Sequence, residues 1–163
     1  MIILLDAMGG DNAPDATIKG AVKAAKEVKS QIILIGNEEL INKKAKEFYG
    51  KSTITEVASN ISIRNTTETI EMCDIPTQAI KTKKDSSMVV GFKMLKEGEG
   101  DVFISAGNSG ALLTGATLLV GRIRGIDRPA IAPLLPAYGK SFLLMDAGAN
   151  TNCKPINLVQ FAQ

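Results

Sequence analysis

Three segments of the sequence join an apolar run to a short loop of glycines and small polar residues. They are Asp6–Asn12, Ser105–Gly110 and Asp146–Asn150. Glycines let backbone amides come close to a ligand, because no Cβ stands in the way. A loop that leads into a helix also presents unpaired N–H groups at the positive end of the helix dipole, which favours an anion such as phosphate.

Each of these loops taken alone is compatible with a simple tight turn, whereas three similar loops together favour a binding site. None of them matches GxGxxG or the Walker A pattern, which argues against dinucleotides and ATP. A small oxyanion is therefore the ligand that the loops predict.

Two further groups of residues offer positive charge. Lys83–Ser87 places lysines before a helix-capping stretch, which could hold a phosphate or a pantetheine phosphate or be a solvated basic turn with an ordinary cap. Arg122, Arg124 and Arg128 carry guanidinium groups, which pair well with phosphate and carboxylate. Arginines after a buried helix often only face the solvent or cap the helix. Of the three we favour Arg128, which directly precedes Pro129.

The composition excludes several other classes of function. The chain contains 0 histidines, which removes the Ser-His-Asp and Cys-His arrangements and histidine-based metal sites. Its 19 basic and 17 acidic residues give a net charge of only +2, which does not support a nucleic-acid partner. Cys73 and Cys153 lack CxxC spacing and a neighbouring base, so we expect them to be reduced, buried filler residues rather than nucleophiles.

The start of the chain predicts a cytoplasmic protein. Ile2–Leu5 is a strand-like run, so no targeting segment is expected before the fold. No apolar stretch approaches the length that is needed to cross a bilayer.

Short apolar runs alternate along the chain with segments of helical period. The runs are Ile2–Leu5, Gln31–Ile35, Ile61–Arg64, Val102–Ile104, Ala130–Ala132 and Phe142–Met145. Continuous apolar runs are typical of strands in a parallel sheet that is covered on both faces. The pattern predicts the α/β class, as a three-layer α/β/α sandwich with right-handed crossovers. All three glycine loops would then lie at the carboxyl edge of one sheet.

Four helices are expected between these runs, with polar residues in place to cap the first three. The expected caps are Asn12, Asn37, and either Asp85 or Ser86. The fourth helix, over residues 108–120, is apolar almost all round and is therefore predicted to be buried. A last segment, 155–161, has the pattern of a helix that is just starting.

Several motifs together resemble the PlsX family of phosphate acyltransferases. They are Asp6–Asp11 with Ala13 and Pro14, Lys84–Met88, Ser105–Ala111, Gly125–Ala130, Asp146 with Gly148–Asn150, and Leu158–Ala162. The resemblance covers all 163 residues in order, and it is to the N-terminal half of a longer family pattern. One departure is Asn65 with Thr66, where the family usually has a His-Ala pair.

The resemblance implies a Rossmann-like, mostly parallel sheet related to phosphate acetyltransferases and to isocitrate and isopropylmalate dehydrogenases. Residues 1–163 would form a single α/β domain, the N-terminal part of a two-lobed protein. The implied reaction moves a fatty acyl group from acyl carrier protein to inorganic phosphate. The acyl phosphate would supply a membrane glycerol-3-phosphate acyltransferase in phospholipid synthesis. A homodimer, no metal or other cofactor, and membrane contact only through the C-terminal half are implied as well.

Phosphate suits a chain without histidine. Phosphate esters lose their last proton with a pKa near 6, and free phosphate is expected to be likewise substantially dianionic at neutral pH, so it can attack a thioester directly. The predicted catalytic residues are Asn108, Asn150, Asp146 and Lys84, with either asparagine as the oxyanion donor. The predicted phosphate- or substrate-binding residues are Gly9, Gly10, Asp11, Ser86, Ser87, Ser105, Gly107, Ser109, Gly110 and Arg128. Asp6 is expected to orient these donors from behind, because a carboxylate in contact with phosphate would repel it.

Two other functions compete with this prediction. One is a metal- and NAD-dependent dehydrogenase of the related fold, which would need clustered aspartates that these 163 residues do not supply. The other is a phosphate-binding or scaffold module without catalytic activity.

Overall fold

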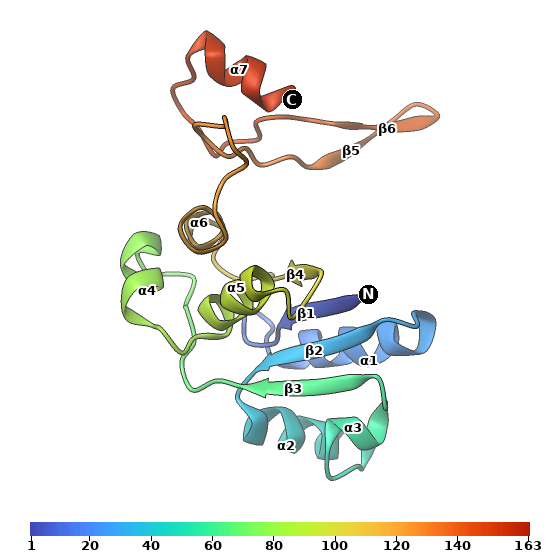
Figure 1. Cartoon of the computed structure of the whole chain (residues 1–163). Helices are drawn as coiled ribbons and strands as arrows, with labels where there is room; N and C mark the ends of the chain where they lie inside the picture. Colours follow the sequence, from blue (N-terminus) through green and yellow to red (C-terminus); the bar gives the residue numbers. More distant parts are fainter. The chain divides into compact units, whose positions relative to one another are not determined.

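The computed structural model describes residues 1–163 and contains two compact units, Met1–Val120 and Gly121–Gln163 (Figure 1). The first unit is an α/β structure, and the second consists of a β-hairpin and a helix. The assignment of residues 1–163 to a single domain of a two-lobed protein stays a prediction.

The first unit is built on a four-stranded parallel sheet. Its strands are β1 (Ile2–Asp6), β2 (Gln31–Gly36), β3 (Ile61–Asn65) and β4 (Val102–Ile104), in the order β3-β2-β1-β4. Each of the first four predicted runs is confirmed as a strand. Because β1 and β4 are parallel neighbours, the loops that follow them leave the same edge of the sheet side by side.

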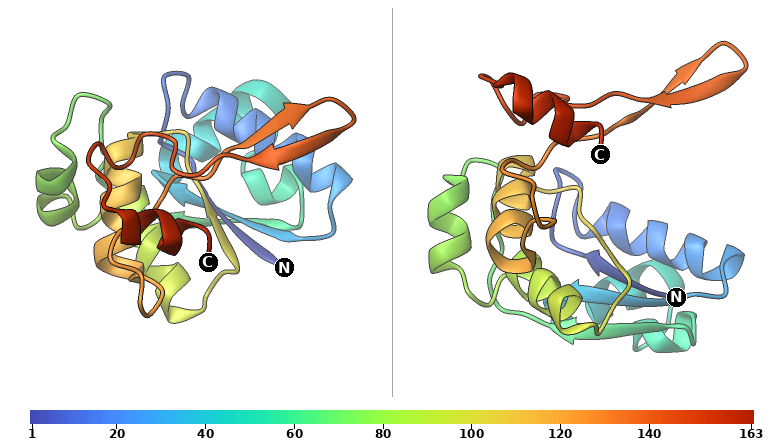
Figure 2. Two further views of the ribbon diagram at one scale, coloured as in Figure 1. Left: turned by 90° about the horizontal axis from the view of Figure 1, so that it is seen from above. Right: turned by 45° about the horizontal axis from the view of Figure 1, so that its top comes forward.

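Helices cover both faces of this sheet, which confirms the predicted three-layer α/β/α arrangement (Figure 2). The helices are α1 (Asp15–Glu27), α2 (Glu38–Tyr49), α3 (Ile54–Val57), α4 (Pro76–Thr82), α5 (Ser87–Glu97) and α6 (Ser109–Gly115), the last continued by the π-helix η1 (Ala116–Val120). Alternate side chains of β2 point to opposite faces. Leu34 packs in the cluster with α1, whereas Ile35 packs with Met94 of α5.

Two of the predicted helix caps are confirmed and one is wrong. The Asn37 side chain accepts a hydrogen bond from the backbone nitrogen of Leu40 at 2.8 Å. Ser86 accepts one from the backbone nitrogen of Val89 at 3.4 Å. The cap position of α1 is Pro14 rather than Asn12, and no side chain caps this helix.

The helix predicted over residues 108–120 differs from the structure in its form and its burial. The α-helical part ends at Gly115, and the following π-helical turn contains no buried residue. Leu118 is 58% exposed. Helix α4 was not predicted, because its two turns are too short to show a clear apolar period.

The second unit corrects the predicted end of the sheet. Strands β5 (Leu134–Ala137) and β6 (Lys140–Leu143) pair antiparallel with each other, and Ala130–Ala132 is not a strand. Only Tyr138 and Gly139 join the two strands, and Gly139 has a φ of 70°. A two-residue turn permits a hairpin, whereas parallel strands need a long crossover.

As a consequence, the Asp146–Asn150 loop does not follow a strand of the parallel sheet, and the prediction of three loops at one sheet edge is wrong for this loop. The helix predicted near the end of the sequence is confirmed as α7 (Pro155–Phe161). None of the helices combines the length and the apolar character that crossing a membrane requires.

Candidate functional site

The loops that follow β1 and β4 touch each other at the carboxyl edge of the sheet. A Cβ placed on Gly9 would lie 3.0 Å from the backbone nitrogen of Gly107. A Cβ placed on Gly10, whose φ is 108°, would lie 3.1 Å from the carbonyl oxygen of Ala106. The lack of side chains at these glycines therefore allows the close approach of the two loops.

The buried carboxylate of Asp6 connects the two loops through hydrogen bonds. Asp6 is 1% exposed, and its carboxylate accepts hydrogen bonds from the Ser105 hydroxyl at 2.7 Å and from the backbone nitrogen of Met8 at 3.1 Å. The Ser105 oxygen in turn accepts from the Gly107 backbone nitrogen at 3.1 Å. The hydroxyl proton of Ser105 and the N–H of Gly107 are thus used within the protein, so these two residues shape the loop.

Other donors of the two loops have no acceptor within the protein. The backbone amides of Gly9, Gly10, Ser109 and Gly110 and the hydroxyl of Ser109 make no hydrogen bond to another protein group. The first amides of a helix lack an intrahelical partner for geometric reasons. The side chain of Asp11 is exposed and forms no ion pair. The two loops together therefore offer several backbone donors to an anion.

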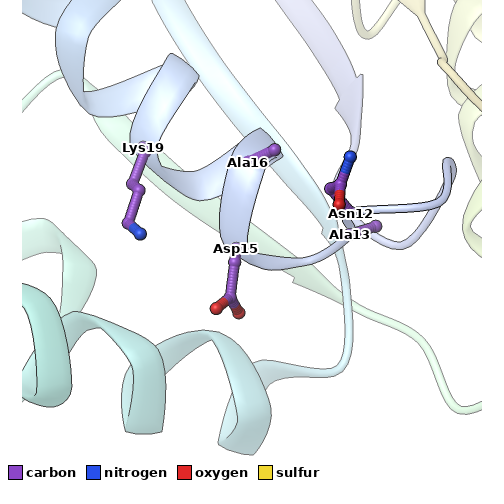
Figure 3. Close-up of a pocket in the computed structure, with 5 residues that line it drawn as sticks. All are labelled: Asn12, Ala13, Asp15, Ala16 and Lys19. Atoms are coloured by element: carbon purple, nitrogen blue, oxygen red, sulfur yellow. The ribbon is translucent and has the colours of Figure 1, made fainter.

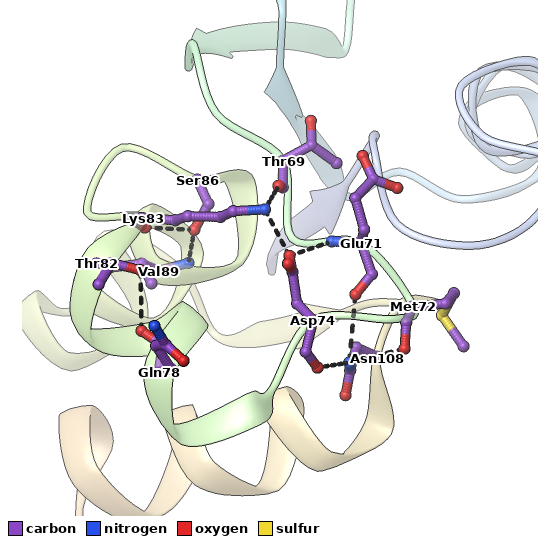
Figure 4. Close-up of polar contacts among 10 residues, drawn as sticks. All are labelled: Thr69, Glu71, Met72, Asp74, Gln78, Thr82, Lys83, Ser86, Val89 and Asn108. Atoms are coloured by element: carbon purple, nitrogen blue, oxygen red, sulfur yellow. Dashed lines mark hydrogen bonds and ion pairs between the residues drawn. The ribbon is translucent and has the colours of Figure 1, made fainter.

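Asn108, one of the two predicted oxyanion donors, has its polar atoms engaged elsewhere (Figure 4). Its carbonyl oxygen caps α6 by accepting from the Ala111 backbone nitrogen at 2.9 Å. Its amide nitrogen donates to the carbonyl oxygens of Glu71 at 3.3 Å, Met72 at 3.2 Å and Asp74 at 3.1 Å. In this arrangement Asn108 ties a neighbouring turn to α6.

The same turn is held by an ion pair that sequence reasoning missed. The ammonium group of Lys83 lies 2.5 Å from the Asp74 carboxylate and donates to the carbonyl oxygen of Thr69 at 2.8 Å. Hydrogen bonds from Lys83 and from the Glu71 backbone nitrogen lower the pKa of Asp74. Sequence alone gives only a weak signal for this pair, because a lysine nine residues after an aspartate is a common spacing.

The predicted phosphate-binding stretch around Lys84 is a capped helix start. Lys84 is exposed, and its ammonium group contacts no acceptor. Ser86 is fully buried and donates to the carbonyl oxygen of Lys83 at 2.8 Å, and Ser87 is buried in the first turn of α5. These contacts are those of an ordinary helix cap, which is the alternative to a phosphate site at this stretch. A substrate role for Lys84, Ser86 and Ser87 stays a prediction.

In the second unit, Asp146 organises its own loop. Its carboxylate accepts from the backbone nitrogens of Ile131 at 2.8 Å and Asn150 at 2.7 Å. Partial burial raises the pKa of Asp146, but the hydrogen bonds from Ile131, Asn150 and Ala149 outweigh it, so the net shift lowers the pKa. The Asn150 amide donates to Asp146 at 3.0 Å and to the carbonyl oxygen of Pro129 at 2.9 Å, so its hydrogens are also engaged.

Arg128 and the two cysteines complete the set of predicted residues. The guanidinium group of Arg128 is exposed and donates to the carbonyl oxygen of Asn152 at 2.9 Å. Cys73 and Cys153 are both free and exposed, so the prediction that they are buried is wrong. Asn65, which stands in place of the family's histidine, accepts from the backbone nitrogen of Glu38 at 3.0 Å.

An open pocket of about 520 Å³ lies at the start of α1 (Figure 3). It is lined by Asn12, Ala13, Asp15, Ala16 and Lys19. The Asp15 carboxylate in its lining forms an ion pair with Lys44 at 3.1 Å. None of the predicted phosphate-binding residues lines it. No group of three or more histidine, cysteine, aspartate or glutamate side chains is placed to hold a metal ion.

Comparison with known proteins gives one family and a set of close relatives. Residues 1–163 match the family described as "Fatty acid synthesis protein". The phosphate acyltransferase of Acetivibrio thermocellus is 52% identical over 166 residues, which cover 99% of this chain and 46% of the relative. The phosphate acyltransferases of Thermoanaerobacterium thermosaccharolyticum and Clostridioides difficile are 51% and 48% identical, again over 99% of this chain and 46% of each relative. The chain thus spans about half the length of these relatives.

Proposed function

Because the chain belongs to the fatty acid synthesis protein family, we propose that it forms part of a phosphate acyltransferase that transfers a fatty acyl group from acyl carrier protein to inorganic phosphate. The names of the relatives support the acyltransferase part of the proposal. The observation that carries its phosphate part is the contact of two glycine loops whose backbone amides have no acceptor within the protein.

The reaction needs little acid–base chemistry from the protein. An oxygen of monohydrogen phosphate attacks the thioester carbonyl carbon, and a tetrahedral oxyanion forms. The carbon–sulfur bond then breaks, and the proton of the phosphate ends on the thiol of the carrier. Phosphate esters become dianions with a pKa near 6. Inorganic phosphate is likewise substantially dianionic at neutral pH, so the attacking monohydrogen phosphate is abundant. A chain with 0 histidines is compatible with this chemistry.

In the proposal, the protein positions the phosphate through the loops Gly9–Asp11 and Ser105–Gly110. Backbone amides are suited to this task because they are fixed before the ligand arrives and carry no charge that needs a counter-ion. Positioning alone can lower a barrier by roughly 7–11 kcal/mol in the best intramolecular cases. Asp6 serves the same end by fixing Ser105 from beneath the loop.

The tetrahedral oxyanion needs a further donor, which is typically worth about 3 kcal/mol. We assign it to one of the free backbone amides of the two loops. The side-chain amides of Asn108 and Asn150 already donate to carbonyl oxygens, and they would have to give up these bonds first. A direct role of Arg128, Lys84 or Asp146 is not required by this assignment.

Several wider features belong to the same proposal. The acyl phosphate would be consumed by a membrane glycerol-3-phosphate acyltransferase in phospholipid synthesis. The protein would act as a cytoplasmic homodimer without a cofactor, with any peripheral membrane contact made by segments outside these residues. The family description and the names of the relatives support only the acyltransferase activity and the link to fatty acid metabolism.

The test uses a substitution that removes one amide donor and keeps the helix. Ser109 is the first residue of α6, and Asn108 before it has an extended backbone, so proline is tolerated at position 109. Ser109→Pro in the full-length protein removes the N–H and the hydroxyl, whereas Ser109→Ala removes only the hydroxyl. Acyl phosphate is trapped with hydroxylamine while the phosphate concentration is varied.

We expect Ser109→Pro to raise the KM for phosphate about tenfold or more, the size of a lost donor to a charged ligand. Ser109→Ala should have a smaller effect. Wild-type KM values in both variants would reject the placement of phosphate at this loop. A non-catalytic phosphate-binding module is the second candidate, favoured by the engaged amides of Asn108 and Asn150. Phosphate binding without acyl phosphate formation would support it.

A further inference from the structure

The turn Glu71–Asp74 lies directly against the start of α6 and is fixed from two sides (Figure 4). On one side, the Asn108 amide donates to three of its carbonyl oxygens. On the other, Lys83 at the end of α4 pairs with the Asp74 carboxylate at 2.5 Å. The Asp74 carboxylate also accepts from the Glu71 backbone nitrogen at 2.8 Å, which closes the turn on itself.

Pro76, the first residue of the helix α4 that follows this turn, also touches the phosphate loop. A Cβ on Gly110 would lie only 2.7 Å from the Pro76 ring, so the first turns of α4 and α6 are in tight contact. Asn108 directly precedes Ser109 and Gly110, whose amides are the proposed donors. The hydrogen bonds of Asn108 to the turn and the packing of Gly110 on Pro76 are both close contacts. A displacement of the turn should therefore also move the amides of Ser109 and Gly110.

We propose that Asn108, Lys83 and Asp74 are positioning residues, which set the place of the Ser109 and Gly110 amides by fixing the Glu71–Asp74 turn. This inference rests on the proposed phosphate site. Lys83 and Asp74 act on phosphate only through the turn and through Asn108. The geometric demand is strict, since a misplacement of about 1 Å in a site can cost on the order of a hundredfold in rate.

The two functions of the Asn108 side chain can be separated by mutation. Its oxygen caps α6, and its nitrogen holds the turn. Asn108→Ser keeps a good capping group but cannot reach the three carbonyl oxygens. Lys83→Met removes the other attachment, and Lys83→Arg keeps the charge and a donor for Asp74. Lys81→Met is the matched control, because Lys81 is an exposed lysine on the same helix that forms no ion pair.

The experiment measures the KM for phosphate and the KM for the acyl thioester in the full-length protein. Asn108→Ser and Lys83→Met should each raise the KM for phosphate about three- to tenfold, as expected for lost hydrogen bonds, with little change in the KM for the thioester. Lys83→Arg should restore most of the wild-type value, and Lys81→Met should retain it. Hydrogen exchange of the Glu71 amide should accelerate in the first two variants, since this amide is held by Asp74.

An unchanged KM for phosphate in Asn108→Ser and Lys83→Met would overturn the inference, as would an equal rise in both KM values. A failure of the proposed function is distinguishable from a failure of the inference. If the wild-type protein formed no acyl phosphate, titration calorimetry with inorganic phosphate would measure the Kd of the same variants. A Kd for phosphate that is three- to tenfold higher in Asn108→Ser and Lys83→Met than in the wild type would still support the positioning role. An unchanged Kd, or no phosphate binding by the wild-type protein, would overturn it.

Discussion

The contact between the two glycine loops leads to a prediction for Gly9→Ala. The added Cβ would lie 2.4 Å from a carboxylate oxygen of Asp6 and 3.0 Å from the backbone nitrogen of Gly107. The first atom is held by the Ser105 hydroxyl, and the second belongs to the main chain of the opposite loop, so neither can move away freely. The backbone of Gly9 is not in the left-handed region, so the steric clash alone sets the effect.

The magnitude follows from the cost of overpacking, which is typically about 1–3 kcal/mol. We expect Gly9→Ala to lower the free energy of unfolding by this amount and to weaken phosphate binding, because the loops are pushed apart. Gly20→Ala is the control. Gly20 lies inside α1 with no atom within 4 Å of an added Cβ, and alanine there should stabilise the helix by up to about 1 kcal/mol.

Urea denaturation followed by circular dichroism measures both free energies, and calorimetry with inorganic phosphate measures the Kd. A Gly9→Ala protein that is as stable as the wild type and binds phosphate equally well would show that the two loops are not packed as described. A loss of stability in Gly20→Ala would show instead that any added methyl group is harmful.

Three further predictions concern stability. The hydrogen bond from Lys83 lowers the pKa of Asp74, so this carboxylate contributes stability above its unfolded pKa of about 3.9 and loses the contribution as the pH falls through the lower folded value. The difference in unfolding free energy between wild type and Asp74→Asn should therefore be present at neutral pH and disappear in strong acid; a constant difference would contradict it. Asn37→Ala should cost about 1 kcal/mol in thermal unfolding by removing the cap of α2, and an unchanged Tm would argue against the cap. Gly91→Ala places a Cβ 2.2 Å from the Phe103 ring and should cost about 1–3 kcal/mol in urea denaturation, with partial recovery when Phe103→Leu is added.

The central sheet could be predicted because its strands carry their signal locally. The runs that became β1, β2 and β4 consist mostly of isoleucine, leucine, valine and phenylalanine, as expected for strands covered on both faces, and the run of β3 carries Ile61 and Ile63. The later runs around residues 130 and 142 look alike in sequence. The first of them is not a strand, and the second overlaps β6, whose two-residue link to β5 at Tyr138 and Gly139 permits only a hairpin. Apolar runs of this kind indicate a strand but not its partner.

The sequence predicted one part of the candidate site, the two glycine loops, but not the contacts of Asn108. Although the contact of Gly9 with Gly107 also requires β4 to lie beside β1, which the sequence does not indicate, the position of both loops at one edge of the sheet follows from the parallel pattern. The attachment of Asn108 does not, because it joins residues 34 to 37 positions apart through carbonyl oxygens that any residue could supply. Side-chain identity predicts a donor, but only the folded chain determines which acceptor it meets.

The claim that backbone amides of two adjoining loops hold phosphate is tested most directly by nuclear magnetic resonance. Inorganic phosphate is titrated into the ¹⁵N-labelled full-length protein, and the shift of each backbone amide is followed. The largest saturable shifts should fall on the amides of Gly9, Gly10, Ser109 and Gly110. Ser109→Pro should raise the Kd for phosphate. Shifts confined to Arg128 and its surroundings, or no saturable shift at the four glycine-loop amides, would contradict the proposed site.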